Sequence, residues 1–373
     1  MNNDLLYKIA LTLVPNIGDI YAKNLISFFG SAEAVFNQSI KQLMQLPNMS
    51  EKSATNLHQH LSQKEYLLRA QKELKFIEDN QVKVLFLDDN EYPRRLKHCN
   101  DAPVLLYYKG NADLNATKIV SVVGTRTPTE YGIKLTEQLI EDLTAQDVLI
   151  VSGLAYGVDV CAHQSALKNK LNTVGVVAHG HDRIYPSHHE NIAYQMHKQG
   201  GILTEFMSET NPDRENFPKR NRIVAGMCDA LVVVETRVKG GSLITAEIAN
   251  SYSRDVFAFP GRSGDEMSSG CNAFIKRNKA MLIEHAGDLL YAMNWSDEHL
   301  KKTKNKKQQI PLAILLNEKE QKIVEALKVK EKVHVDELSY HSGFTSSETS
   351  GILLQLEFNN IIKSLPGKLY SLI

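Results

Sequence analysis

The sequence predicts an α/β protein whose middle part is a doubly wound parallel sheet, with a helical domain before it and a small helix-rich domain after it. Between about residues 115 and 295, apolar runs of strand character recur roughly every 25 to 30 residues and alternate with helical segments, which is the spacing of βαβ units. The flanking regions lack this alternation and read mainly as helices. The change of pattern indicates separate domains.

The composition is that of a protein with a large core and no overall charge. Its 373 residues are 43% apolar, and 43 basic residues balance 43 acidic ones. The length allows two or three domains, and any contact with nucleic acid must come from a local basic patch. Nowhere do 18 apolar residues stand together, and no basic leader is visible, so we expect neither a membrane span nor export.

The N-terminal region, residues 1–65, contains an internal repeat. Pro15-Asn16-Ile17-Gly18 recurs as Pro47-Asn48-Met49-Ser50, an offset of 32 residues, and each copy leads into a helix. Two short helices joined by such a turn resemble a helix-hairpin-helix (SAM-like) unit, whose backbone N–H groups can grip a phosphate backbone. A helical packing domain without DNA contact is the alternative. Residues 66–114 then read as an extension of the main sheet.

The central domain, residues 115–295, supplies the strands of the parallel sheet. The predicted strands are 119–123, 148–151, 173–178, 201–205, 230–234, 255–259 and 280–284. A glycine or a charged residue follows nearly every strand. In a parallel sheet these positions share one rim, at the carboxyl ends of the strands, where ligands bind in open α/β folds.

The first strand of this domain leads directly into a candidate anion site. In IVSVVGTRTPTEYG the strand ends at Gly124, Thr125 and Arg126, and a helix begins at about Glu130. Gly124 allows a close backbone approach, and Arg126 offers a fork of donors suited to phosphate. G-x-G-x-x-G and Walker patterns are both absent, which excludes a dinucleotide site and a P-loop.

A second basic stretch is NFPKRNRIVAG. Pro218 is suited to start a helix, so that Lys219, Arg220 and Arg222 lie in its first turns. Cations there oppose the helix dipole unless an anion is bound. Lys219 and Arg222, three residues apart, are expected to share a face, and Phe217 offers a surface on which a base can stack.

A third stretch, KGGSLITAE, places Lys239, Gly241 and Ser242 at another helix start, which forms a natural nest for a phosphate. Several phosphate sites along one rim suit a polymer better than a nucleotide. The alternative is that these charges only form surface ion pairs.

The C-terminal part begins with a lysine-rich linker, residues 296–311, which includes KKTKNKK. Residues 312–373 then read as three helices and a hairpin about Pro366-Gly367, which is a winged helix. Its third helix carries Glu348 and Glu357 and no lysine or arginine. Such a helix repels phosphates, so we expect this module to contact protein and not to read DNA.

Six stretches taken in order, SVVGTRTPTEYG, SGLAYGVDVCAHQSAL, GHDRIYP, NFPKRNRIVAG, KGGSLITAE and VFAFPG, resemble the DNA-processing protein A (DprA/Smf) family. The resemblance implies a Rossmann-like domain that binds single-stranded DNA without sequence preference and forms a homodimer. It also implies that the protein loads the recombinase RecA during natural transformation in the bacterial cytoplasm. The candidate DNA-binding residues are Gly124, Thr125, Arg126, Phe217, Lys219, Arg220, Asn221, Arg222, Lys239, Gly241 and Ser242.

An enzyme is the competing interpretation. Phosphoribohydrolases of the "lonely guy" type carry P-G-G-x-G-T-x-x-E on a comparable loop, and Lys239 to Glu247 supplies the glycine pair and the glutamate but neither the proline nor the third glycine. Such an enzyme would release the base from a nucleoside monophosphate. The modules on either side favour the DNA-binding interpretation, so we expect neither catalysis nor a cofactor.

Other chemical patterns are incomplete. The cysteines, Cys99, Cys161, Cys228 and Cys271, form no C-x-x-C pair, so we expect reduced thiols. The histidines His179, His181, His188 and His189 complete no known metal spacing, so no metal is expected. Asp159 is expected to cap a helix in which His163 packs one turn later, and Ser152 lacks the G-x-S-x-G elbow of a hydrolase.

Overall fold

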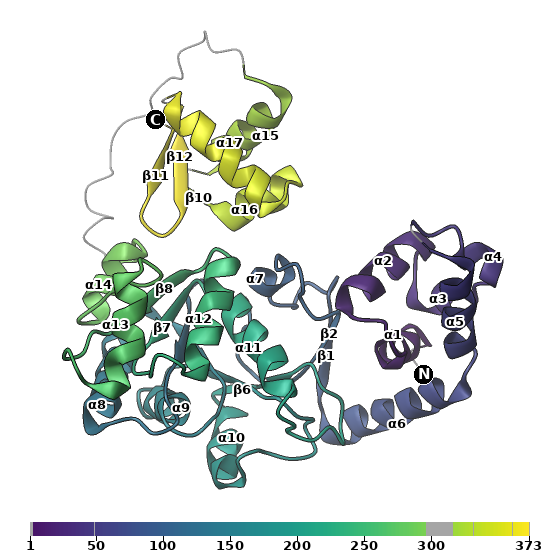
Figure 1. Ribbon diagram of the computed structural model, residues 1–373, viewed down its shortest axis with the longest axis horizontal. Helices are drawn as coiled ribbons and strands as arrows, with labels where there is room; N and C mark the ends of the chain where they lie inside the picture. The colour runs from purple at the N-terminus through teal and green to yellow at the C-terminus, as the bar shows by residue number, and fades with distance from the viewer. Residues whose placement is uncertain (1–2, 48, 296–315, 331, 360, 373) are drawn as a thin grey trace.

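The computed structural model describes residues 3–47, 49–295, 316–330, 332–359 and 361–372. The N-terminal helices form one end of the molecule, a nine-stranded sheet with its helices forms the middle, and the C-terminal domain lies beside the sheet (Figure 1). The order of elements along the chain confirms the predicted fold class.

The N-terminal domain is a packed set of short helices. They are α1 Asn3–Leu13, α2 Asp19–Phe29, α3 Ala32–Phe36, α4 Ile40–Leu43, α5 Glu51–Leu61 and α6 Lys64–Asn80. The repeat has a structural meaning, because a helix begins shortly after each copy, at Asp19 and at Glu51. Ser50 accepts a hydrogen bond from the backbone N–H of Ser53 and caps α5, whereas Gly18 leaves α2 without a side-chain cap.

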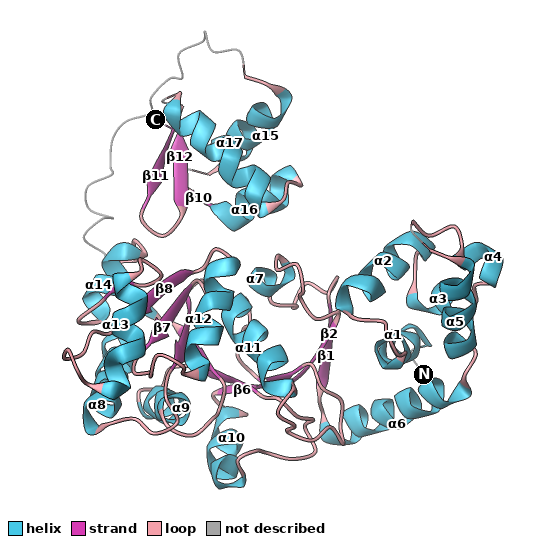
Figure 2. Cartoon of the chain, viewed as in Figure 1, coloured by secondary structure: helices cyan, strands magenta, loops and turns pink. Residues whose placement is uncertain are grey.

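The sheet runs in the order β1-β2-β6-β5-β4-β3-β7-β8-β9. Figure 2 shows strands of this sheet in magenta among the cyan helices. Its strands are β1 Lys83–Phe86, β2 Leu105–Gly110, β3 Ile119–Val123, β4 Leu149–Ser152, β5 Thr173–Val176, β6 Gly200–Thr204, β7 Ala230–Val233, β8 Asp255–Ala258 and β9 Met281–Leu282. All pairs from β6 to β9 are parallel, and β1 and β2 add an antiparallel extension beside β6. Each predicted strand is present, although the last is only two residues long.

Helices cover both faces of the sheet, which is why its strands are apolar on both sides. The helices of this part are α7 Arg94–Lys97, α8 Glu130–Asp142, α9 Val158–Lys168, α10 Glu190–Met196, α11 Asn216–Met227, α12 Gly241–Ser251, α13 Ser269–Lys276 and α14 Ala286–Ala292. One core contains side chains of α8, α9 and α14, and the other contains those of α11, α12 and α13. The strand order reverses between β3 and β7, so loops on both sides of this point lie along the carboxyl rim.

The C-terminal domain is a winged helix. It consists of α15 Glu318–Val329, β10 Val333–His334, α16 Val335–Ser342, α17 Ser346–Phe358, β11 Ile362–Leu365 and β12 Leu369–Leu372. Buried Arg254, just before β8, forms an ion pair with Asp336, and Lys368 in the turn of the wing lies 3.8 Å from Asp255. The wing therefore faces the amino edge of the sheet, opposite the carboxyl rim. The predicted linker, residues 296–311, lies outside the described residues.

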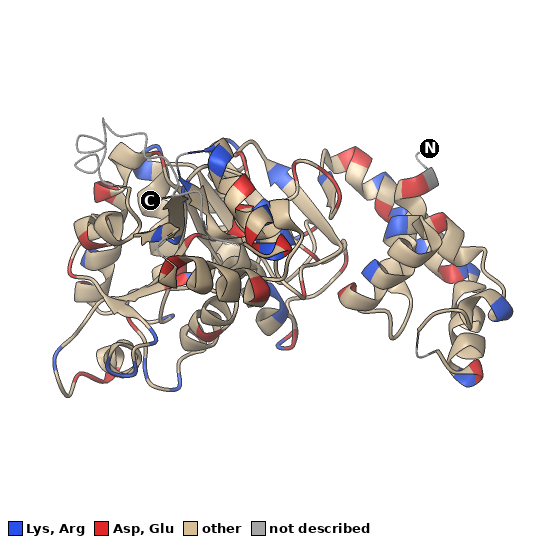
Figure 3. Cartoon of the chain, turned by 90° about the horizontal axis from the view of Figure 1, so that it is seen from above, with Lys and Arg blue, Asp and Glu red and all other residues tan. Residues whose placement is uncertain are grey.

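In the part of the chain that the structure describes, no helix is long and apolar enough to cross a membrane, and no group of three or more histidine, cysteine or carboxylate side chains could hold a metal ion. Basic and acidic residues are interspersed over the helical domain and the sheet domain (Figure 3). Any basic site must therefore be built locally.

Candidate nucleic-acid interface

The loop after β3 is the centre of the carboxyl rim and packs tightly against α9. A Cβ on Gly124 would lie 2.5 Å from the side chain of Val158, so a larger residue would push the loop outward. The N–H of Thr125 donates to the carbonyl of Glu235 at 2.7 Å, and the N–H of Val158 donates to the carbonyl of Thr125 at 3.2 Å. Gly124 and Thr125 therefore hold the loop in place, and the loop presents Arg126.

Arg126 is exposed and forms no ion pair with any described residue. Its guanidinium lies 5.5 Å from the centre of the Phe217 ring, which is half-buried at the start of α11. The predicted cation and the predicted stacking surface, which are 91 residues apart in the sequence, are thus neighbours in space. Lys219, in the first turn of α11, is also exposed.

Arg220 is buried, with only 5% of its surface exposed, and cross-links two strand ends. Its Nη1 donates to the carbonyl of Val176 at 2.7 Å and also to the carbonyl of Gly153, and its Nε donates to Oδ1 of Asn221 at 3.1 Å. Burial lowers the pKa of this guanidinium, which nearby Asp159 opposes. Arg220 and Asn221 therefore support the rim from below.

Arg222 lies on the same side of α11 as Lys219, since both act on Glu205, but Arg222 is largely buried whereas Lys219 is exposed. Nη2 of Arg222 donates to Asp19 at 3.0 Å and to Glu205 at the end of β6. Burial alone would lower the pKa of Arg222, but the two carboxylates outweigh it and hold the pKa above its usual value. The anion that the helix start required is thus supplied by the chain itself, and Asp19 also accepts from the N–H of Val104 at 2.9 Å.

The start of α12 has one exposed part and one buried part. Lys239 and Gly241 are exposed, and no side chain caps the helix, so its first N–H groups can face an anion. Ser242 is buried, and its hydroxyl donates to Thr236 at 2.8 Å. Glu247, the glutamate of the phosphoribohydrolase interpretation, is exposed and pairs with Lys279 at 2.5 Å.

Asp159 and His163 do not form a pair. Gly157 is the N-cap of α9, so Asp159 is not the cap residue that we expected but lies inside the first turn. It accepts hydrogen bonds from the loop before it, at Gly153 and Ala155, and burial raises its pKa. Nδ1 of His163 lies 2.7 Å from the hydroxyl of Thr173, and burial lowers the pKa of this histidine to about 3.

The four clustered histidines each have a separate role in holding loops. Nδ1 of His179 is 2.9 Å from the carbonyl of Gly180, and its Nε2 accepts from the N–H of Tyr185 at 3.1 Å. His181 contacts the carbonyl of Tyr107 at 3.1 Å. Burial lowers the pKa of both histidines, which favours neutral imidazoles.

His188 and His189 contact the loop that follows β4. Nδ1 of His188 is 3.3 Å from the hydroxyl of Tyr156, and Nδ1 of His189 is 2.9 Å from the carbonyl of Leu154.

Sequence reasoning missed Tyr156 and Tyr185. Both are about half exposed and line a shallow hollow with Arg126 and Phe217. The signal was present in SGLAYGVD and GHDRIYP, because each tyrosine stands in a loop after a strand of the parallel sheet. An aromatic residue in such a loop faces the ligand rim, which the glycines and charges in the same loops already indicated.

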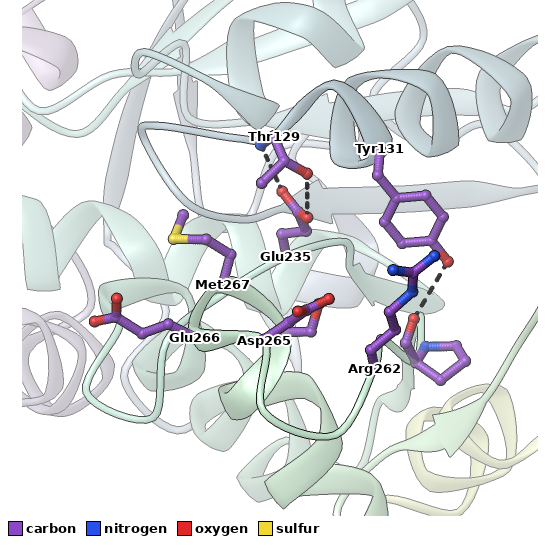
Figure 4. A pocket seen from close by; sticks show the side chains of 10 residues that line it. Thr129, Tyr131, Glu235, Arg262, Asp265, Glu266 and Met267 are labelled. Carbon is purple, nitrogen blue, oxygen red and sulfur yellow. Dashed lines mark hydrogen bonds between the residues drawn. The ribbon is translucent and has the colours of Figure 1, made fainter.

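A larger hollow of about 720 Å³ lies on the other side of the β3 loop (Figure 4). Glu235 lies at its base and accepts from the N–H and the hydroxyl of Thr129 at 2.9 and 2.6 Å. Asp265, Glu266 and Arg262 also line it. Three carboxylates against one arginine disfavour phosphate here, so a polyanion is better accommodated on the Arg126 and Phe217 side.

Comparison with known proteins gives a consistent result for the helical region, the sheet domain and the C-terminal domain. A family model described as DNA recombination-mediator protein A matches residues 83–294, one described as a DprA winged helix domain matches 309–368, and one described as a SAM-like helix-hairpin-helix tandem matches 8–63. The DNA processing protein DprA of Streptococcus pneumoniae is 41% identical over 54% of this chain and 71% of its own length. The protein Smf of Synechocystis is 33% identical over 78% and 73%.

Solved structures agree with the sequence comparisons. The crystal structure of DprA from Streptococcus pneumoniae matches with a TM-score of 0.64 at 31% identity, over 78% of this chain and 97% of that one. DprA from Helicobacter pylori matches with a TM-score of 0.52 at 28% identity, over 59% and 96%, and its structure is described as showing a unique single-stranded DNA binding mode.

Proposed function

The chain belongs to the DNA-processing protein A (DprA/Smf) family, and from this premise we propose that it binds single-stranded DNA along the carboxyl rim of its sheet, as a binding protein and not as an enzyme. The observation that carries the proposal is the pairing of Arg126 with Phe217, because a free cation beside an aromatic ring provides both a phosphate contact and a base-stacking surface. Lys219, in the first turn of the helix that begins beside Phe217, adds a second exposed cation.

Within this proposal the predicted residues have two roles. The residues assigned to DNA contact are the exposed Arg126, Lys219, Lys239 and Gly241, together with Phe217, whose ring lies beside Arg126. The remaining predicted residues position the rim from within; they are Gly124, Thr125, Arg220, Asn221, Arg222 and Ser242. Because phosphates carry no sequence information, binding of this kind is independent of sequence.

Binding to a labelled oligothymidine, followed by fluorescence anisotropy, tests the proposal. Phe217→Ala should weaken binding by about 1 to 3 kcal/mol, the usual contribution of one base-stacking ring. The melting temperature should fall little, since the ring is only half-buried. A large drop in melting temperature with unchanged affinity would instead make Phe217 a core residue.

The finer parts of the proposal rest on family membership. They are that the protein loads RecA onto the bound strand during natural transformation, that it forms a homodimer through the sheet domain, and that it is located in the cytoplasm. The rate at which RecA filaments nucleate on single strands, with and without this protein, tests the first. Sedimentation of the free protein tests the second. Release of free base from nucleoside monophosphates would favour the phosphoribohydrolase interpretation and overturn the assignment as a binding protein.

A further inference from the structure

The winged helix is attached to the amino edge of the sheet by polar contacts and not by a shared apolar core. Among the described residues, the apolar cluster of the winged helix contains only its own side chains, from Leu316 to Leu372. The apolar clusters of the sheet domain contain no described residue beyond Trp295. Two domains of one chain move relative to each other unless a large apolar interface joins them. The docked position of the winged helix therefore depends on a few specific contacts.

The first contact is the buried ion pair between Arg254 and Asp336. The side chain of Arg254 is only 3% exposed, and its Nη1 donates to the carboxylate of Asp336 in the first turn of α16. Its Nη2 donates to the carbonyls of Arg95 and Gly226 at 2.7 and 3.2 Å, so the sheet domain fixes the guanidinium from the other side. Burial alone would lower the pKa of Arg254, but Asp336 outweighs burial and the pKa is raised. The sheet domain thus presents an oriented cation, and the winged helix supplies its carboxylate.

The second contact is the turn of the wing, which points toward the sheet domain (Figure 1). A Cβ on Gly367 would lie 2.3 Å from the carbonyl oxygen of Met293, just after α14, so the backbones of the two domains meet there. Lys368, the next residue of the turn, lies 3.8 Å from Asp255. Gly343 has a similar left-handed backbone, with a φ of 72° against 81° for Gly367, but no described atom lies within 4 Å of its Cβ position. A comparison of the two glycines therefore separates backbone strain from the contact between domains.

Two histidines lie where the domains meet, one on each side. His334 is the N-cap of α16, and its Nδ1 is 3.7 Å from Asp336. His98 follows α7 in the sheet domain, and its ring centre is 5.6 Å from that of Tyr340 on α16. Burial lowers the pKa of both histidines, which favours neutral imidazoles in the docked state. The charged groups that face these rings are Asp336, Arg254 and Lys97 for His98, and Asp336, Asp229, Arg254 and Arg95 for His334.

We propose that the winged helix is held on the sheet domain by a releasable latch, formed by the Arg254–Asp336 ion pair and the turn of the wing, and that protonation of His98 and His334 opens it. When the domains separate, Asp336 and both imidazoles return to water, so the winged helix retains no unpaired buried charge. The latch does not depend on the proposed binding of single strands.

The direction of the pH response follows from the docked environment of the two histidines. In the separated state each imidazole has its ordinary pKa of 6.5, so that state binds protons that the docked state does not bind. Docking is at full strength above pH 6.5 and weakens as the pH falls from 6.5 toward the lowered pKa values, by up to about 100-fold per pH unit for two protons. Burial raises the pKa of Asp255, which acts in the opposite direction, so variants without the histidines identify the switch.

Small-angle X-ray scattering of the full-length protein measures separation of the domains through the radius of gyration. Acrylamide quenching of Trp295, the single tryptophan of the chain, gives a second measurement, because this residue lines the hollow between the two domains. Both quantities should rise when the pH is lowered from about 7.5 to about 5.5, across the ordinary pKa of histidine. Sedimentation under the same conditions separates opening from a change in oligomeric state.

Two pairs of variants test the contacts of the latch at neutral pH. Asp336→Asn and Gly367→Ala should each open the protein without acid, the first by removing the carboxylate and the second by pushing the turn of the wing away from Met293. Glu337→Gln and Gly343→Ala are the matched controls and should stay docked. Glu337 is the next carboxylate of the same helix turn but pairs with Lys330 in its own domain, and Gly343 faces open space.

The double variant His98→Gln with His334→Asn tests the switch, since neither new side chain titrates and asparagine can still cap α16. It should remain docked at about pH 5.5, where the wild type opens. Wild-type scattering and quenching for both Asp336→Asn and Gly367→Ala would overturn the latch, and so would a wild type that is already open at neutral pH. An equal acid response in the double histidine variant would overturn the proton switch and leave the latch standing.

Discussion

Replacing Arg126 with glutamine should lower the salt dependence of single-strand binding, whereas replacing Arg220 should not. Arg126 is exposed and has no carboxylate partner among the residues that the structure describes, whereas Arg220 is bound to the carbonyls of Gly153 and Val176. Each phosphate contact on a single strand contributes a slope of about 0.7 in log affinity against log salt. Over a fourfold rise in salt, from about 50 to about 200 mM, Arg126→Gln should therefore lose about 2.6-fold less affinity than the wild type.

Anisotropy titrations of a labelled oligothymidine at four salt concentrations measure these slopes. Arg220→Gln should lower the affinity at every salt concentration and keep the wild-type slope, because it removes support for the loops and not a phosphate contact. Arg277→Gln, an exposed arginine after α13, is the matched control and should change neither quantity. An unchanged slope for Arg126→Gln, or a slope for Arg220→Gln that falls as much, would refute the division of roles.

Three further predictions follow from the contacts of the rim and of the domains. Single-strand affinity should fall as the pH drops below 6.5, because the neutral imidazole of His179 accepts a hydrogen bond from the N–H of Tyr185. Burial lowers the pKa of His179, so this imidazole becomes protonated, and the contact is lost, only as the pH passes through that lowered value. Asp182, Arg183 and Arg220 also act on this imidazole, so His179→Gln, which cannot titrate, is the decisive comparison: an equal acid loss in this variant would contradict the prediction. Arg222→Met should lower the free energy of unfolding by about 3 to 5 kcal/mol, since it leaves the largely buried Glu205 and the partly exposed Asp19 without their cation. A denaturant titration that matches the wild type would disprove it. Truncation after Trp295 should change single-strand affinity less than about tenfold, or about 1.4 kcal/mol, in titrations at matched salt, and a larger loss would place the winged helix in the DNA site.

The sequence by itself determined the fold class and the position of the rim. Alternating apolar runs and helical segments predicted each parallel strand to within a few residues, because burial on both faces of a sheet leaves a local and periodic trace. The carboxyl ends of the strands could be located because glycine and charged residues, such as Gly124 and Arg126, directly follow the apolar runs. The repeat around Pro15 and Pro47 likewise marked the starts of two helices.

Only the tertiary structure decided what the individual side chains on that rim do. Arg220 and Arg222 stand two residues apart in one basic motif, yet neither is free, because their partners come from other elements: Gly153 and Val176 for the first, Asp19 and Glu205 for the second. The sequence pattern around each arginine contains no trace of partners as far as 203 residues away.

Tyr156 and Tyr185 also show that the sequence pattern does not reveal which side chains become neighbours in the fold. Each is a lone aromatic residue in a glycine-containing loop, and neither has a periodic pattern that marks it as part of a site. They become neighbours of Phe217 only because β4 and β5 lie side by side in the sheet and end at the same rim. Strand order is set by packing over the whole domain, so the folded sheet determines which side chains become neighbours at the rim.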